Sequence, residues 1–133
     1  MTTGARIRWT LGAWLAVLAA PTHAEPVVFV AGGSGRSGIE IVKQLVQAGY
    51  PVKARTRDAD RARARFGVGI DWVTVDLLDP SAAADALKGV DVVVSALGHG
   101  DMVGIESPQV VHNLAIRNLI DAAKVHKVDH FVL

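Results

Sequence analysis

The chain has 133 residues, half of them hydrophobic, with a formal net charge of +1 and no cysteine. This length predicts one domain at most, and so small a net charge argues against a nucleic-acid partner, which usually needs a strongly basic face. The lack of cysteine excludes disulfide bonds and thiolate metal sites. We predict no metal site, because the histidines are scattered without ligand spacing; they are His23, His99, His112, His126 and His130.

The first 24 residues resemble a secretory signal peptide rather than part of a folded domain. Arg6 and Arg8 form a positively charged start, residues 9–20 form an apolar stretch of 12 residues, and residues 21–24 resemble a cleavage site. The apolar stretch is short for a membrane span, which needs about 20 residues. The expected location is therefore periplasmic or secreted. An uncleaved membrane anchor, or a cytoplasmic protein with a misassigned start codon, is the alternative.

The remaining segment, residues 25–133, begins with a predicted strand, a glycine-rich turn and a helix. The run of β-branched and aromatic residues from Val27 is typical of a buried parallel strand, and apolar residues at helical spacing follow Gly38. Gly32, Gly35 and Gly38 are spaced as G-x-x-G-x-x-G, one residue longer than the G-x-G-x-x-G form of the dinucleotide fingerprint.

Glycine suits this turn because the chain must adopt unusual dihedral angles and approach a pyrophosphate closely. Free N–H groups at the start of the helix would then meet the anion, and the helix dipole would add about 0.3 to 1 kcal/mol. Ser34 and Ser37 could add hydroxyl donors, and Arg36 could add a positive charge. The alternative is a turn that only connects a strand to a helix, but the strand–loop–helix context favours dinucleotide binding.

Further strands and helices are predicted in alternation along the rest of the chain. Gly49 and Pro51 end the first helix, and Ser81 is the expected N-cap of the helix that begins at Pro80. The predicted strands span residues 52–56, 70–75, 90–96 and 129–133, and the predicted helices span residues 58–66, 80–88 and 107–125. The arginines of the first of these helices, Arg61, Arg63 and Arg65, are typical of a solvated face.

Alternating strands and helices with right-handed crossovers predict an α/β, Rossmann-like parallel sheet of about five strands, in the order 3-2-1-4-5, with helices on both faces. In such sheets the ligand binds beyond the carboxyl ends of the strands, where the strand order reverses. The loops after the first four strands should meet there. The fifth strand would be an unpaired edge, which favours association with a second copy of the chain.

The end of the second strand favours NADP(H) as the cofactor. About 20 residues after the glycine turn, NAD-selective chains carry an acidic residue, whereas an arginine accommodates the 2′-phosphate of NADP. Arg57 stands in this neighbourhood, and a guanidinium can hold a phosphate through two parallel hydrogen bonds. Asp58 follows, and could bind a ribose or cap the next helix. NAD is therefore the alternative cofactor.

Four motifs resemble those of atypical short-chain dehydrogenase/reductases, and most closely the NmrA-like and flavin/biliverdin-reductase-B-like NAD(P)H-binding group. The motifs are Gly-Gly-Ser-Gly-Arg-Ser-Gly at 32–38, Thr-Arg-Asp at 56–58, Asp-Leu-Leu-Asp at 76–79 and Val-Asp-Val-Val-Val-Ser-Ala-Leu-Gly at 90–98. The likeness runs from about Pro26 to Leu133. As a set the motifs are specific for the cofactor domain and weak for any substrate.

The resemblance implies a role for each motif. The glycine loop would hold the pyrophosphate, the arginines after the second strand would hold the 2′-phosphate, and the other two loops would line the adenine and the nicotinamide sides. Asp76 could instead only cap the next turn, and Leu97 could only belong to the core. The predicted cofactor-binding residues are Gly32, Ser34, Gly35, Arg36, Ser37, Gly38, Arg57, Arg61, Asp76, Leu77, Ala96, Leu97 and Gly98.

The reaction implied by the resemblance is hydride transfer from the nicotinamide to an unknown acceptor. The reductase families place a catalytic Ser, or a Tyr-x-x-x-Lys pair, after strand five, whereas this sequence stops inside the predicted strand. Its single tyrosine, Tyr50, lies in a turn at the wrong end of the sheet. We therefore assign no catalytic residue and expect an N-terminal half of the family fold. A non-catalytic redox sensor and an inactive fragment are the alternative functions.

Overall fold

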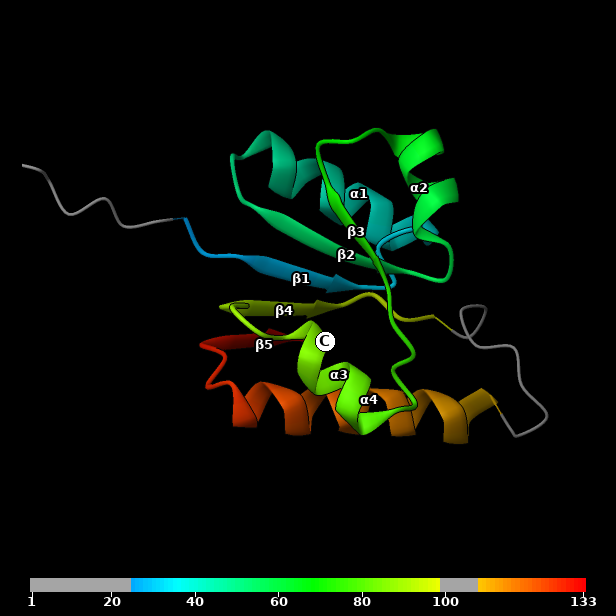
Figure 1. Cartoon of the computed structure of the whole chain (residues 1–133), viewed down its shortest axis with the longest axis vertical. Coiled ribbons are helices and arrows are strands. Elements are labelled where there is room, and N and C mark those ends of the chain that lie inside the picture. The colour runs from blue at the N-terminus through cyan, green and yellow to red at the C-terminus, as the bar shows by residue number, and fades with distance from the viewer. Residues whose placement is uncertain (1–24, 99–107) are drawn as a thin grey trace, which may run out of the picture.

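The computed structural model describes residues 25–98 and 108–133, which form a five-stranded parallel sheet with four helices (Figure 1). The sheet has the order β3-β2-β1-β4-β5, and all four neighbouring pairs are parallel. The strands are β1 (Val28–Ala31), β2 (Val52–Thr56), β3 (Asp71–Thr74), β4 (Val92–Ser95) and β5 (His130–Val132). The helices are α1 (Arg36–Gln47), α2 (Ala59–Phe66), α3 (Pro80–Ala86) and α4 (Pro108–Val125). The predicted Rossmann-like fold and strand order are confirmed.

Two apolar cores lie on opposite faces of the sheet, because successive side chains of a strand point to opposite faces. Phe29 of β1 and Val93 of β4 pack against α3 and α4. Val28 and Val30 of β1 pack against α1 and α2, together with the buried Trp72 of β3. Figure 1 shows α1 and α2 beside β2 and β3, and α3 and α4 beside β4 and β5. Every residue of β1 is buried, as expected for a central parallel strand.

The end of α1 agrees with the sequence prediction, whereas the start of α3 differs from it. Gly49 has φ +92° and its N–H donates to the carbonyl of Val46, so it ends α1 as predicted. The prediction that Ser81 caps α3 is wrong. Asp79 is the N-cap, and its Oδ1 accepts a hydrogen bond of 2.9 Å from the backbone N–H of Ser81. Pro80 then occupies the first turn, which places Ser81 inside the helix.

Some sequence predictions concern residues outside the described ranges. The signal segment 1–24, the loop residues His99 and Gly100 and the helix start at Ser107 are among them. Among the residues that are described, no helix combines the length and the apolar character that a membrane crossing requires.

Candidate functional site

The loop between β1 and α1 lies beyond the carboxyl end of β1 and directly beside the end of β4. Gly32 has φ +78°, a left-handed conformation that favours glycine. A Cβ atom at Gly32 would lie 2.7 Å from the carbonyl oxygen of Ala96, and the N–H of Ala96 donates to the carbonyl of Ala31 at 2.8 Å. The glycine loop therefore sits at the switch point of the sheet, where the strand order reverses between β1 and β4.

Two other glycines of the loop allow α1 to sit close to the sheet. Gly38 lies in the first turn of α1, and a Cβ atom there would overlap the carbonyl oxygen of Gly32. A Cβ atom at Gly33 would lie 2.9 Å from the Cβ of Ala54 on β2. Gly35 differs from the expectation of unusual dihedral angles, because its φ of −71° and ψ of 171° are extended values that any residue adopts. The backbone conformation therefore does not require glycine at position 35, and the predicted role of Gly35 depends on a ligand approaching its backbone closely.

The N-terminus of α1 opens toward the same end of the sheet. The helix begins at Arg36, earlier than the sequence pattern predicted, so Ser37 and Gly38 belong to its first turn. Gly35 is the N-cap and no side chain caps the helix. The first N–H groups of a helix have no intrahelical acceptor, and such a terminus attracts anions. This part of the molecule therefore has the geometry of an anion-binding site.

A groove of about 220 Å³ lies between the glycine loop and α2, and we call it the arginine groove. Two of its lining residues carry hydroxyl groups, Ser34 Oγ and Thr56 Oγ1, which lie 3.0 Å apart. Thr56 is the last residue of β2 and is buried. The full lining is Ser34, Thr56, Arg57, Asp58, Arg61, Ala62, Arg65 and Phe66.

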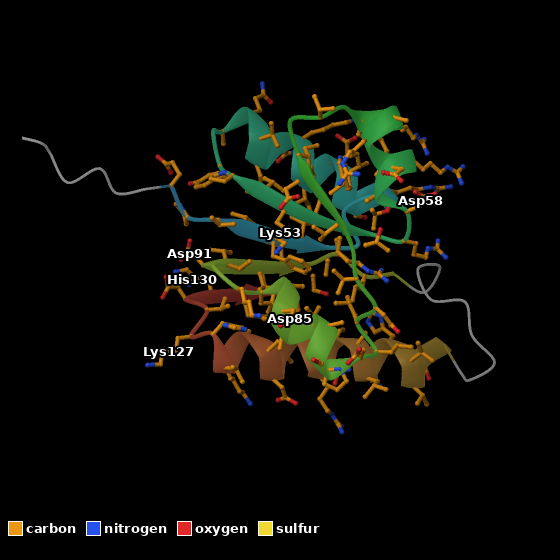
Figure 2. The ribbon with its side chains drawn as sticks, viewed as in Figure 1. Lys53, Asp58, Asp85, Asp91, Lys127 and His130 are labelled. Carbon is orange, nitrogen blue, oxygen red and sulfur yellow. The ribbon has the colours of Figure 1, made fainter. Side chains whose placement is uncertain are left out.

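Three arginines line this groove, Arg57, Arg61 and Arg65. Within the described part of the chain, none of them has a carboxylate at salt-bridge distance. The single acidic lining residue, Asp58, caps α2, because its Oδ1 accepts a hydrogen bond of 3.0 Å from the backbone N–H of Arg61. Figure 2 shows Asp58 at the start of α2, at the carboxyl end of the strands. The groove is therefore positively charged.

The neighbouring arginines are directed elsewhere. Arg63 donates to Asp60 Oδ1 at 2.9 Å and to the carbonyl of Trp72 at 3.0 Å. Arg55 precedes Thr56 on β2, so its side chain leaves the opposite face of the strand, and its Nε donates to the carbonyl of Val75 at 2.9 Å. The solvated-face interpretation of the α2 arginines is therefore incomplete, because two of them line the groove.

The loop after β3 is held by its own contacts. Asp76 is exposed, and its Oδ1 accepts a hydrogen bond of 2.9 Å from the N–H of Leu78, so it caps the turn as the alternative interpretation held. Leu77 is buried in the core, and its carbonyl accepts a hydrogen bond of 2.9 Å from Asn118 Nδ2. The side chain of Leu77 therefore does not face a ligand. A contact with adenine would fall to the backbone of this loop.

The loop after β4 lies on the other side of the switch point. Ala96 and Leu97 are half-buried and Gly98 is exposed. Leu97 packs against the core under α3 and α4, as the alternative interpretation held. The structure thus brings Ala96 against the glycine loop and leaves Gly98 accessible beside it, while the segment that follows lies outside the described residues.

Asn118 positions the β3–α3 loop, although the sequence alone did not single it out. We expect Asn118→Leu to lower the free energy of unfolding by about 1 to 3 kcal/mol, because the buried carbonyl of Leu77 loses its hydrogen-bond donor. The exposed Asn113 on the same helix is the matched control, and Asn113→Leu should change stability by less than about 0.5 kcal/mol. Equal effects in urea unfolding of the two variants would contradict this role.

Charged groups at the other end of the sheet are remote from this site. Asp91, Lys127 and His130 lie at the amino ends of β4 and β5, opposite Asp58 (Figure 2). On α3, a hydrogen bond and the positive charge of Lys88 hold the pKa of Asp85 below its ordinary value.

Residues 25–98 and 108–133 contain no group of three or more His, Asp or Glu side chains that could hold a metal ion.

A parallel sheet with a glycine loop and an open helix N-terminus at its switch point defines the dinucleotide-binding class of Rossmann proteins. The sequence model of the NAD(P)H-binding family matches residues 32–133, and the chain belongs to this family. Several of its curated relatives are named as reductases, and the family match confirms the resemblance to NAD(P)H-binding, reductase-like proteins that the motifs predict.

Three known proteins illustrate the relationship. The chain is 36% identical over 108 residues to an NAD(P)H azoreductase of Xenophilus azovorans, covering 80% of this chain and 34% of that protein. A solved structure of a candidate exported protein from Burkholderia pseudomallei is 27% identical, with TM-score 0.62, and covers 80% of this chain and 46% of that one. The oxidoreductase ylbE of Lactococcus lactis is 22% identical, with TM-score 0.66, over 79% of this chain and 46% of that one. The chain spans less than half the length of the curated relatives it matches.

Proposed function

We propose that this chain is an NADP(H)-binding domain of a reductase-like protein that transfers hydride from the nicotinamide to an acceptor. The observation that carries the proposal is the arginine groove, which includes Ser34 of the glycine loop and is lined by three arginines without a carboxylate partner among the described residues. Family membership supports a nicotinamide dinucleotide. The groove supports the choice of NADP.

In this proposal, different residues of the chain contact different parts of the cofactor. The N-terminus of α1 and the loop residues Ser34 to Ser37 hold the pyrophosphate, and Gly32 and Gly38 allow the loop to take that shape. Arg57 and Arg61 hold the 2′-phosphate in the groove that Ser34 and Thr56 also line. A bound, reduced nicotinamide would supply the hydride. The backbone of Ala96 and Gly98 would lie along the nicotinamide side of the cofactor.

The acceptor class is open to a direct experiment. One relative is named an NAD(P)H azoreductase, so azo compounds, quinones and free flavins are the acceptors to test with the full chain and NADPH. Acceptor-dependent oxidation of NADPH supports the reductase proposal. Tight NADPH binding without turnover would favour the alternative of a redox sensor that passes the cofactor state to a partner, while the cofactor proposal itself would stand.

The proposed location is outside the cytoplasm. The basic start and the apolar stretch of residues 9–20 support a cleaved signal, and a structural neighbour at 27% identity is described as a candidate exported protein. N-terminal sequencing of the protein recovered from a bacterial periplasm tests this. A mature chain that begins near Glu25 is expected, and an unprocessed chain in the cytoplasm would contradict it.

Self-association through the edge of the sheet is a further part of the proposal. β5 pairs only with β4 in the described part of the chain, and an apolar hollow of about 360 Å³ beside it is lined by Ile120, Ala123, Lys124, Lys127, Val128 and Phe131. Val132 of β5 is 51% exposed. An unpaired strand next to exposed apolar surface favours a second copy of the chain as its partner.

Val132→Lys should therefore abolish association, because lysine on an edge strand blocks pairing with another strand. Light scattering of the full chain over a hundredfold range of concentration measures the effect. Val68 is 89% exposed in the α2–β3 loop, so Val68→Lys is the matched control and should associate as the wild type does. A wild-type chain that stays monomeric throughout would contradict the proposal.

A further inference from the structure

A third arginine, Arg65, lines the arginine groove beside Arg57 and Arg61 and offsets the negative charge of Asp58. Arg57, Asp58, Arg61 and Arg65 line the groove, which is a net charge of +2. A phosphate monoester carries about −1.5 to −2 charges at pH 7. Without Arg65 the groove would carry +1 and would leave a phosphate dianion incompletely neutralised. With Arg65 the two charges match.

Arg65 is also held in place on the groove wall. It follows Arg61 by one helical turn, which brings both side chains to the same face of α2. Its Cζ lies 5.1 Å from the centre of the Phe66 ring, and that ring lies 5.6 Å from the ring of Trp72, which is 1% exposed. A guanidinium over an aromatic face is stabilised by the cation–π interaction. Because the aromatic pair is anchored in the core, less side-chain freedom is lost when an anion binds.

We propose that Arg65 is a specificity-determining residue that completes the neutralisation of a 2′-phosphate dianion and sets the preference for NADP(H) over NAD(H). This inference rests on the proposed function of the groove. It adds a second residue of α2 to Arg57 and Arg61, the two arginines that the sequence motifs assigned to the 2′-phosphate. The charged groups that face the phosphate are then Arg57, Asp58, Arg61 and Arg65, all from the β2–α2 segment.

The test compares Arg65→Gln with Arg63→Gln in the full chain. Both substitutions remove one positive charge from the same helix, but Arg63 is directed to Asp60 and to the carbonyl of Trp72, whereas Arg65 lines the groove. Titrations with NADPH and NADH, followed by nicotinamide fluorescence, give the two affinities. Arg65→Gln should weaken NADPH roughly fivefold, the upper end for an exposed charge pair, and leave NADH unchanged. Arg63→Gln should change neither.

A second readout reports on the phosphate itself. The free 2′-phosphate has a second pKa of about 6, and three guanidinium groups should lower the pKa of the bound phosphate by favouring the dianion. A ³¹P NMR titration of bound NADP should show this lowering in the wild type and in Arg63→Gln, and a smaller lowering in Arg65→Gln. A substitution that only loosened the helix would not move this pKa selectively.

Three results would overturn the inference. If Arg65→Gln and Arg63→Gln weaken NADPH equally, the effect belongs to the net charge of α2. If Arg65→Gln weakens NADPH and NADH equally, Arg65 has a structural role only. A wild type that binds NADH as tightly as NADPH would overturn the proposed cofactor preference and this inference together, whereas the first two results leave that preference intact.

Discussion

Gly38→Ala is expected to lower the melting temperature by about 4 to 24 °C and to abolish the binding of NADPH and NADH together. The added Cβ atom would overlap the carbonyl oxygen of Gly32, a backbone atom that cannot move without shifting the loop. Overpacking of this kind costs about 1 to 3 kcal/mol, and each kcal/mol corresponds to about 4 to 8 °C in a domain of this size. The shifted loop would also displace the N-terminus of α1 from the switch point.

Gly69→Ala is the matched control for this prediction. Gly69 has no heavy atom within 4 Å of an added Cβ and has no left-handed φ. The same chemical change should therefore leave both the melting temperature and the cofactor affinity close to the wild-type values. Thermal unfolding with and without cofactor measures both effects, and a Gly38→Ala variant that melts and binds like Gly69→Ala would contradict the proposed seating of the helix.

Arg57→Ala is expected to weaken NADPH by about 10- to 100-fold and to change NADH by less than about twofold. Arg57 lines the arginine groove at the end of β2, next to the hydroxyls of Ser34 and Thr56. A hydrogen bond to a charged group contributes about 1.5 to 3 kcal/mol, and only NADPH carries the phosphate that would receive it. The ratio of the two dissociation constants isolates this contribution from any general loss of stability.

The control for Arg57→Ala is Arg117→Ala. Arg117 is exposed on α4, which packs on the opposite face of the sheet from α2. Its removal makes the same change in net charge and should leave the ratio of the two dissociation constants unchanged. Equal losses of NADPH and NADH affinity in Arg57→Ala would remove the assignment of the 2′-phosphate to this groove.

The order of the strands could be predicted because alternating strands and helices with right-handed crossovers allow few topologies. The boundaries of the elements depend instead on patterns within short segments. Val52–Thr56 was predicted with the bounds that β2 has, since its turn residues and alternating polarity lie in the sequence itself. The start of α1 was placed too late, because a glycine in a first turn resembles a loop residue until its contact with Gly32 is known. Asp79 and Ser81 were both plausible caps by residue type, and only the position of Pro80 in the helix separates them.

The sequence predicts the glycine loop and the strand end of the site, but not all of the residues that line the groove. Gly32 and Arg57 could be predicted from the sequence, because each belongs to a short motif whose spacing along the chain identifies it. Thr56, Arg65 and Phe66 belong to the groove because α2 packs against β2 and β3, a tertiary arrangement that a single sequence does not display. The alternating period of β2 could have directed Thr56 toward α1, and the four-residue spacing of Arg61 and Arg65 could have placed both on one face.

The most direct test of the account is a parallel titration of the full chain with NADPH and NADH, in which nicotinamide fluorescence and the melting temperature are followed together. We expect tighter binding of NADPH than of NADH, with a rise in melting temperature that grows with cofactor concentration as binding to the folded state requires. A folded chain that binds neither cofactor, with no change in melting temperature, would contradict the account.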